Sequence, residues 1–502
     1  MHRKMKIAGN CIAAICLTVC ILYYLTNLME RKAGEEKYAD FFEQQEDFDV
    51  LFMGTSHVIN AVFPMMLWNE YGIVSYNFGG HDNRIPTTYW VMKNALEYTN
   101  PKVVVIDCAE LSSPYKCSNS FSYVHLSLDA FPLNAMKIRA IWDLLDDPIF
   151  EKDIVNGTIT QRDEPRTKIG LLWDYSVYHS RWAEITQSDF EPAFTYEKGA
   201  ESRIAVTRGQ LEKIPADQKM EGGTIGDKYL KKMIEECQDR GIEVLLTYLP
   251  FAAVEHLQME ANYIYDVAEE YGVNYINFLD MELINYQTDF YDKSHVNPSG
   301  ARKITDYLGR YLTSNYKMAD QRKNGEYAFW CEDYKEYTEL KNRNIVACDD
   351  MEVYLMLLAG DNVNATIDVR DKSIFRNAGV ISLLENLGVN TNELTENTDF
   401  IIIRDGGKKT VVINDFRDYD RSAVTELGEI RISYDVDGSL HDGETGFFVL
   451  YLDGEELLQG NMNEDINMLV SVRRDGVEVD TVRFVYVVDS ESAGVVTSAA
   501  NR

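Results

Sequence analysis

A serine and a histidine, each with neighbours that suit nucleophilic catalysis, are the residues of this sequence with the clearest chemical potential. Ser56 follows a short apolar run in Met53-Gly54-Thr55-Ser56-His57. A serine at a sharp turn from a strand into a helix projects its hydroxyl from the carboxyl end of a sheet, where open α/β folds bind ligands. Serine is also a favoured helix cap, so Gly-x-Ser alone indicates a nucleophile only weakly.

The histidine has an aspartate three residues before it, in Tyr291-Asp292-Lys293-Ser294-His295-Val296-Asn297-Pro298-Ser299-Gly300. On a loop that enters a helix, an aspartate at this spacing can accept the Nδ1–H of the imidazole and leave Nε2 facing a nucleophile. The pattern predicts Ser56 as nucleophile, His295 as base and Asp292 as the residue that orients the base. In the competing interpretation, Ser56 caps a helix and His295 only packs. His57 is a rival base, but its place beside Ser56 directs it along the following helix.

The elements that would position these residues follow from the apolar pattern between about residues 48 and 312. Short apolar runs alternate there with amphipathic stretches, which predicts a parallel sheet covered by helices. The expected strands are 50–53, 73–76, 103–106, 244–248 and 275–278. The expected helices are 87–98, 227–240, 256–271 and 298–312, with a further one beginning within 58–67. Pro298 and its predecessor Asn297 suit a helix start, as first residue and as cap.

A segment from about residue 112 to 226 interrupts this alternation and contains Trp142, Trp173 and Trp182. So long a connection in a compact domain is usually a functional insertion or a lid. A helical elaboration that covers the sheet edge is the equally favoured alternative.

The two chemical motifs carry a resemblance to a known family. Gly54-Thr55-Ser56-His57 resembles the Gly-Asp-Ser-Leu block of SGNH (GDSL-like) hydrolases, and Asp292-x-x-His295-x-x-Pro298-x-Gly300 resembles their last block. The resemblance covers about residues 45–315 and implies a flavodoxin-like α/β domain with a parallel sheet. It also implies a Ser56, His295 and Asp292 triad for ester hydrolysis or acyl transfer. Membrane-anchored branches of the family, including proteins that acylate cell-wall polymers or exopolysaccharides, likewise have the serine turn just after a transmembrane helix.

The resemblance is incomplete at the oxyanion hole. Asn77-Phe78-Gly79-Gly80-His81-Asp82-Asn83 resembles the block whose glycine N–H stabilises the oxyanion, and Gly79 is its best match. The next block usually supplies an asparagine, but here the chain runs through Asp107-Cys108-Ala109-Glu110 without one. Asn83 could substitute as a side-chain donor. One lost oxyanion donor costs on the order of 10²–10³ in turnover, so the gap argues against a fast hydrolase.

The N-terminus predicts a membrane anchor. Arg3, Lys4 and Lys6 precede an apolar run from residue 7 to 29, which is long enough to span a bilayer. The run does not end in the small residues of a signal-peptidase site, which favours an uncleaved signal anchor over a cleavable signal peptide. With a cytoplasmic tip and anchor at residues 1–30, the protein would be a single-pass plasma-membrane protein with its domains outside.

Composition excludes several other classes of function. The net charge of −32 repels nucleic acid, which is therefore not an expected partner. The eight cysteines do not form a disulfide pattern, although Cys108 and Cys117 could pair or remain buried thiols. No spacing of histidines or cysteines indicates a metal site, so neither a metal nor another cofactor is expected. The sequence gives no oligomeric state.

Residues 320–502 predict a second, α+β or mostly β domain. Asp-Gly pairs at 405–406, 453–454 and 475–476 separate β-rich runs and are strong hairpin signals. A helix is expected from Asn377, as cap, to residue 387, closed by Gly388. Residues 354–358, 367–371, 383–388 and 461–484 weakly resemble interleukin-like EMT-inducer (PANDER-like) domains, which suggests a glycan-binding role.

Together these patterns predict a membrane-anchored, extracytoplasmic serine esterase or O-acyltransferase. Its expected substrates are acyl groups, acetyl foremost, on a cell-surface glycan or wall polymer. The alternative is a catalytically degenerate SGNH scaffold that serves as a glycan-binding or assembly factor, suggested by the missing asparagine and the appended domain.

Overall fold

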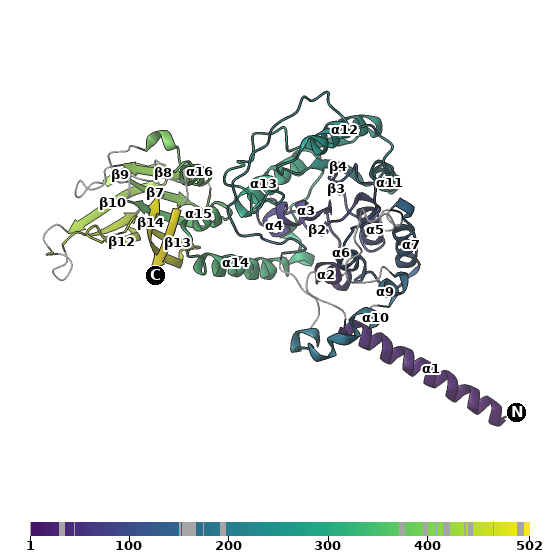
Figure 1. Ribbon diagram of the computed structural model, residues 1–502. Coiled ribbons are helices and arrows are strands. Elements are labelled where there is room, and N and C mark those ends of the chain that lie inside the picture. Colours follow the sequence, from purple (N-terminus) through teal and green to yellow (C-terminus); the bar gives the residue numbers. More distant parts are fainter. Residues whose placement is uncertain are drawn as a thin grey trace. The chain divides into compact units, whose positions relative to one another are not determined.

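The computed structural model describes most of the chain (Figure 1). The described residues are 2–29, 36–44, 46–149, 152, 167–173, 175–190, 197–370, 377–394, 400–407, 409–414, 422–435, 438–439, 445–464, 466–488 and 496–501. Parts of several predicted segments lie outside these residues, among them the 1–30 anchor, the insertion at 112–226 and the 367–371 and 461–484 motifs. The chain divides into two compact units. The first contains residues 1–201, 212–281 and 308–327, and the second contains residues 202–211, 282–307 and 328–502.

The first helix, α1 (His2–Met29), contains the predicted apolar segment. Its 21 residues from Lys6 to Thr26 have a mean hydropathy of 2.0, and none of them is buried. A helix of this length and composition can cross a membrane. The prediction of an apolar N-terminal helix is confirmed, and this helix fits a membrane anchor or a signal sequence equally well.

The first unit is built on a five-stranded parallel sheet, as predicted. Its strands are β1 (Val50–Gly54), β2 (Ser75–Gly79), β3 (Val103–Asp107), β4 (Glu243–Tyr248) and β5 (Asn274–Asn277), in the order β2-β1-β3-β4-β5. The strands β1 to β3 are buried throughout, which explains the apolar sequences of β1 and of residues 103–106 in β3. The chain reverses its direction of travel across the sheet between β1 and β3, so the carboxyl ends of these two strands flank the switch point.

Helices precede, connect and follow the strands. They are α2 (Glu36–Gln44), α3 (Ser56–Ala61), α4 (Pro64–Tyr71), α5 (Ile85–Ala95), α11 (Ile225–Asp239), α12 (Glu255–Tyr271) and α13 (Pro298–Asn315), followed by the short turns η3 (Gln321–Lys323) and η4 (Gly325–Tyr327). Residues of α13 are shared between the two units. The helix expected within 58–67 is two helices, because the residue before Pro64 cannot easily stay helical and Val62 and Phe63 are extended.

The predicted insertion contributes helical turns to the first unit. Its described elements are α6 (Phe121–Leu128), α7 (Ala135–Leu145), α9 (Lys168–Leu172), α10 (Tyr175–Tyr178), η1 (His179–Ala183) and η2 (Gln187–Phe190). Near its end, the backbone N–H of Asn77 in β2 donates to the carbonyl of Lys198 over 3.0 Å. Residues 197–200 therefore cover the β2 edge of the sheet. Cys108 and Cys117 are both buried free thiols rather than a disulfide.

The second unit contains two antiparallel sheets. The larger has β6 (Asn364–Val369), β7 (Phe400–Asp405), β8 (Lys409–Asn414), β13 (Met468–Arg474), β14 (Val477–Val488) and β15 (Val496–Asn501), in the order β15-β14-β13-β6-β7-β8. The smaller has β9 (Ser422–Thr425), β10 (Gly428–Asp435), β11 (Phe447–Leu452) and β12 (Glu455–Asn461), in the order β12-β11-β10-β9. The helices are α14 (Trp330–Val346), α15 (Met351–Ala359), α16 (Ala378–Asn386) and η6 (Thr391–Glu393).

Successive side chains along the strands of the larger sheet point to opposite faces, and the apolar ones form a core on each face. In β7, Phe400 and Ile402 pack in the core that includes the residues of α15 and α16, whereas Ile401 and Ile403 pack with residues of the smaller sheet. The six-stranded sheet thus has helices on one face and the second sheet on the other. The predicted α+β character of residues 320–502 is confirmed.

The turn signals of this unit are mostly confirmed. Asp453 and Gly454 have φ values of 48° and 86°, and Asp475 and Gly476 have 50° and 79°, as a type I′ turn requires. Between β7 and β8 the prediction was wrong by one residue, because Gly406 and Gly407 take the positive φ values there. In α16, Asn377 caps the N-terminus by accepting from Gly379 and Val380, and Gly388 closes the helix with φ 86°.

Candidate active site

Ser56 lies on the predicted turn from β1 into α3. Thr55 caps the helix by accepting a hydrogen bond from the backbone N–H of His57 over 3.2 Å, and Ser56 is the first helical residue and half-buried. A Cβ atom at Gly54 would lie 2.7 Å from Val58 Cγ2 and 2.8 Å from Asp107 Cβ, so only glycine fits between β1 and β3. The sequence therefore places the serine hydroxyl at the carboxyl edge of the sheet, beside the switch point.

Gly79 ends β2 directly against this turn. A Cβ atom on Gly79 would lie 2.7 Å from the Thr55 carbonyl oxygen. The Gly79 N–H, expected to stabilise an oxyanion, donates to Asn77 Oδ1 over 2.9 Å. Asn77 Nδ2 in turn donates to the carbonyls of Val58 and Val62 over 2.7 and 2.8 Å. Asn77 thus braces α3, a role that an amide side chain in a fully buried strand could have signalled.

Asn83, the other expected oxyanion donor, is 2% exposed. Its Oδ1 accepts a hydrogen bond from Ser127 Oγ of α6 over 2.6 Å. Its buried Nδ2 has no acceptor within hydrogen-bond geometry in the described part of the chain. Burial raises the pKa of the nearby Tyr38 hydroxyl, and the Asn83 amide beside it partly offsets that rise. Of the two expected donors, Asn83 therefore has the more available N–H.

Asp107 stands at the end of β3, where the resembled family usually has an asparagine shortly after the strand. It is buried, and Oδ1 accepts from the Leu249 N–H over 2.9 Å. Oδ2 lies 4.0 Å from Nδ1 of His57, whose ring packs on Phe251 with 4.4 Å between centroids. Burial raises the pKa of Asp107 to about 7, against the lowering effect of the N–H donors of Leu249 and Ala109. This carboxyl group therefore changes charge near neutral pH.

The predicted base and its orienting residue are brought together in the second unit. His295 Nδ1 lies 3.0 Å from each carboxylate oxygen of Asp292. Asp292 Oδ1 also accepts the backbone N–H groups of Ser294 and His295 over 2.7 and 2.8 Å. Burial raises the pKa of Asp292, but these hydrogen bonds outweigh it and lower the pKa below its ordinary value. Because an ionised carboxylate only accepts, Nδ1 carries the proton and Nε2 is the acceptor of the neutral ring.

A closed loop holds this pair. Phe290 and Val296 form an antiparallel bridge, and the Tyr291 N–H donates to the carbonyl of His295 over 2.8 Å. The predicted cap, Asn297, accepts from the N–H groups of Ser299 and Gly300 over 3.1 and 3.3 Å. The loop therefore enters α13 in the way that its sequence predicts.

Exposure distinguishes this pair from the other histidine–carboxylate pairs among the described residues. The pairs are His57 with Asp107, His81 with Glu201, His125 with Asp129, and His295 with Asp292. In the first two, nitrogen and oxygen are 4.0 and 3.6 Å apart, too far for a hydrogen bond. His125 is hydrogen-bonded but only 1% exposed, whereas the His295 side chain is 25% exposed. His295 is thus the paired imidazole that a substrate can reach.

The expected site residues fall in both units. Ser56, Gly79 and Asn83 belong to the first, and Asp292 and His295 belong to the second. The pairing of Ser56 with His295 stays a prediction. Comparison of the chain with protein-family models, with curated proteins and with solved structures found no match.

Proposed function

We propose that this protein is a membrane-anchored, extracytoplasmic serine esterase or O-acyltransferase of the SGNH type. Its substrates are acyl groups, acetyl foremost, of a cell-surface polysaccharide or wall polymer. The observation that carries the proposal is the accessible Asp292–His295 pair, whose Nδ1–H is fixed on an ionised carboxylate. Such a pair is what a serine hydroxyl needs to lose its proton during attack.

The arrangement of the first unit supports the nucleophile. Its strand order, β2-β1-β3-β4-β5, is that of flavodoxin-like folds, which bind ligands outside the carboxyl ends of the strands at the switch point. Ser56 follows the carboxyl end of β1 and is half-buried. A reactive hydroxyl at this point would stand at the edge where this class of sheet meets its ligands.

In the proposed reaction, Ser56 Oγ bonds to the acyl carbonyl carbon while its proton moves to Nε2 of His295. The Asp292 carboxylate stabilises the resulting imidazolium, which then gives the proton to the departing sugar oxygen as the ester C–O bond breaks. Water, or a hydroxyl of another sugar, then attacks the acyl-serine and gives its proton to His295. His295 returns that proton to Ser56 Oγ as the bond between the acyl group and the serine breaks. Asn83 Nδ2 and the Ser56 N–H would stabilise the negative charge on the carbonyl oxygen.

Residues beside α1 support a position at the membrane. Arg181 Nη1 of η1 donates to the carbonyl of Met29, the last residue of α1, over 2.9 Å. Nearby in the sequence, Trp173 and Trp182 have exposed fractions of 42% and 70%. Tryptophan is enriched where a protein meets the membrane–water interface, so this insertion suits the surface of a bilayer that α1 crosses.

A second candidate, a non-catalytic glycan-binding or assembly factor, is favoured by two observations at the oxyanion site. The Gly79 N–H already has an acceptor in Asn77 Oδ1. The carboxyl end of β3 has the acidic Asp107, and the Cys108-Ala109-Glu110 segment directly after it contains no asparagine. Both features reduce the number of donors for a developing oxyanion, and a scaffold that only binds glycans does not need such donors.

The test uses the full-length protein in detergent with a fluorophosphonate probe and an aryl acetate. The proposal predicts labelling and acetate release for the wild type, and neither for Ser56→Ala. Ser120→Ala is the control, because Ser120 lies at the start of a helix, α6, and its side chain makes no cap hydrogen bond. Labelling that persists in Ser56→Ala would contradict the proposal. Retention on immobilised wall polysaccharide, without labelling or acetate release in the wild type, would favour the second candidate.

A further inference from the structure

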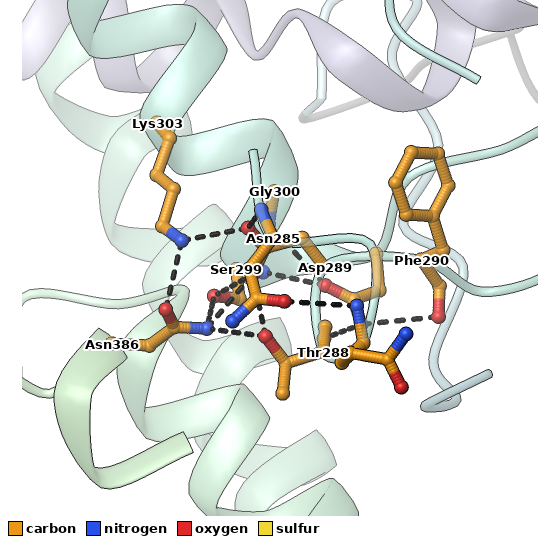
Figure 2. A network of polar contacts seen from close by, with 10 residues as sticks. Asn285, Thr288, Asp289, Phe290, Ser299, Gly300, Lys303 and Asn386 are labelled. Carbon is orange, nitrogen blue, oxygen red and sulfur yellow. Dashed lines mark hydrogen bonds and ion pairs between the residues drawn. The ribbon is translucent and has the colours of Figure 1, made fainter. Parts of the chain in front are cut away.

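The loop that carries Asp292 and His295 begins after a buried carboxylate, Asp289, which is 0% exposed. Figure 2 shows the polar contacts around Asp289. Lys303 Nζ donates to Asp289 Oδ2 over 2.6 Å, and the Asn285 N–H donates to the same oxygen over 2.8 Å. Ser299 Oγ donates to Oδ1 over 3.0 Å. A buried charge needs this many donors, because each missing one leaves desolvation uncompensated.

Thr288 Oγ1 also donates to Oδ1, over 3.4 Å, and one further donor to Asp289 comes from a distant part of the sequence. Asn386, the last residue of α16, donates from Nδ2 to Asp289 Oδ1 over 2.8 Å and lies 97 residues away along the chain. The same Nδ2 lies 3.0 Å from Thr288 Oγ1 and 3.1 Å from Ser299 Oγ, and Asn386 Oδ1 accepts from Lys303 over 2.8 Å. One side chain thus joins the end of α16, the start of α13 and the base of the loop (Figure 2).

Asp289 is coupled to both ends of the loop through the backbone. Its carbonyl accepts the N–H of Asn297 over 2.9 Å, and the next residue, Phe290, forms the bridge with Val296. The residues between this hydrogen bond and this bridge form only the turn that contains the Asp292–His295 pair. A shift of Asp289 therefore moves both arms of the turn together.

Residues 202–211 brace the same loop. The Thr207 N–H donates to the Phe290 carbonyl over 2.8 Å, and Thr207 Oγ1 donates to the Tyr291 carbonyl over 2.6 Å. The next residue, Arg208, is ion-paired to Glu352 of α15 at 2.9 Å. Two helices of residues 328–502 therefore contact this part of the structure. The helix α16 binds Asp289 at the base of the loop, and α15 binds the segment 202–211 that braces the loop.

We infer that Asn386 is a positioning residue for the Asp292–His295 pair, and that residues 328–502 are a working part of the catalytic site rather than only an appended module. The inference rests on the proposed function. Catalytic groups must be held to about 0.5 Å of their productive geometry by neighbours whose own positions are fixed. Asn386 holds Asp289 in place, at the point where the loop begins.

The first test follows the pH dependence of probe labelling at Ser56 in full-length Asn386→Ala. A misplacement of about 1 Å can cost 10²-fold in rate, so we expect labelling to slow by about tenfold to 100-fold. We also expect the acid limb of the pH–rate profile to move to lower pH, because a loosened carboxylate stabilises the imidazolium less well. Asn386→Ser, whose hydroxyl can still donate, should recover part of both effects.

The control separates positioning from general loss of stability. Val482→Ala truncates a fully buried side chain of β14 in the core beside α15 and α16 and leaves Asn386 intact. It should lower the thermal midpoint without moving the acid limb. If Asn386→Ala and Asn386→Ser keep the wild-type acid limb, or move it no more than Val482→Ala does, the inference is overturned.

A second measurement tells failure of this inference from failure of the proposed function. In protein with ¹⁵N-labelled histidine, the His295 resonances are identified by their loss in His295→Asn. We expect the Nδ1–H signal of a proton held by Asp292 to weaken through faster exchange in Asn386→Ala and to persist in Val482→Ala. An unlabelled Ser56 in the wild type would refute the proposed function but leave this signal measurable. A signal unchanged in Asn386→Ala would refute the positioning role whether or not Ser56 reacts.

Discussion

His295 Nδ1 lies 3.0 Å from both carboxylate oxygens of Asp292, while two backbone N–H groups of the same turn hold Oδ1. The carboxylate is therefore fixed by its own loop before it meets the imidazole. The pKa of Asp292 is lowered, so this carboxylate stays ionised at pH values where an ordinary aspartate would begin to take up a proton. The charge that stabilises the imidazolium therefore persists in mildly acidic solution.

Asp292→Asn should slow probe labelling at Ser56 by on the order of 10³–10⁴, because the amide can hold the imidazole in the wrong tautomer. The acid limb of the pH–rate profile should move to lower pH, since the imidazolium loses its anionic partner. Asp129→Asn is the control, because His125 and Asp129 form a pair of similar geometry in the buried part of the insertion. An equal slowing in both variants would remove Asp292 from the mechanism.

Asp107 gives a prediction about stability. Its pKa is raised from 3.8 to about 7, so between these values the folded protein binds more protons than the unfolded chain. Stability from this group is present at low pH and is lost as the pH rises through about 7. A pKa difference of about three corresponds to about 4 kcal/mol. The advantage of Asp107→Asn over the wild type in urea unfolding should therefore widen between pH 5 and pH 8, and a constant difference would contradict the assignment.

Asn83→Ala tests the oxyanion donor. Removing one such donor costs on the order of 10²–10³ in turnover, so release of acetate from an aryl acetate should fall by that factor with little change in KM. Ser127→Ala removes only the hydroxyl that donates to Asn83 Oδ1 and should have a much smaller effect. If the two variants are equally impaired, Asn83 contributes packing rather than a hydrogen bond to the reaction.

Gly79→Ala tests how closely β2 supports the serine turn. The new Cβ atom would lie 2.6 Å from the Ile59 nitrogen and 2.7 Å from the Thr55 oxygen, both backbone atoms that cannot rotate away. We expect a loss of about 1–3 kcal/mol in stability and slower labelling of Ser56. Gly325→Ala, whose Cβ atom would meet nothing within 4 Å, should change neither.

Local sequence signals predicted the parts of the fold that local physics determines. The apolar runs that form β1, β3 and β4, the Asn377 and Asn297 caps, and two of the three Asp-Gly turns are all present. The predicted start of β2 was wrong because contacts with neighbouring residues determine it. Ile73 is a buried apolar residue but precedes β2, because Gly72 takes φ 67° and the Ile73 N–H donates to the carbonyl of Leu67.

The support of the candidate site could not be predicted in the same way. The hydrogen bond between Asn386 and Asp289 joins residues 97 apart, and no sequence motif contains both of them. The brace from Asn77 to α3 likewise depends on which carbonyls come within reach once β2 is placed. Hydrophobic periodicity and capping residues predict only the helix, strand or turn in which a residue lies. Contacts between residues far apart in the sequence form only once the chain has folded. The histidine–aspartate spacing succeeded because both partners share one loop.

The central claim is that Ser56 is the nucleophile and that His295, rather than its neighbour His57, is the base. The most direct test measures the rate and site of fluorophosphonate labelling in full-length wild type, Ser56→Ala, His295→Asn and His57→Asn, with the modified peptide identified by mass spectrometry. We predict that the wild type and His57→Asn are labelled on Ser56, that His295→Asn is slowed by on the order of 10³ or more, and that Ser56→Ala is unlabelled. Labelling at another residue, or a loss in His57→Asn with full labelling in His295→Asn, would contradict the account.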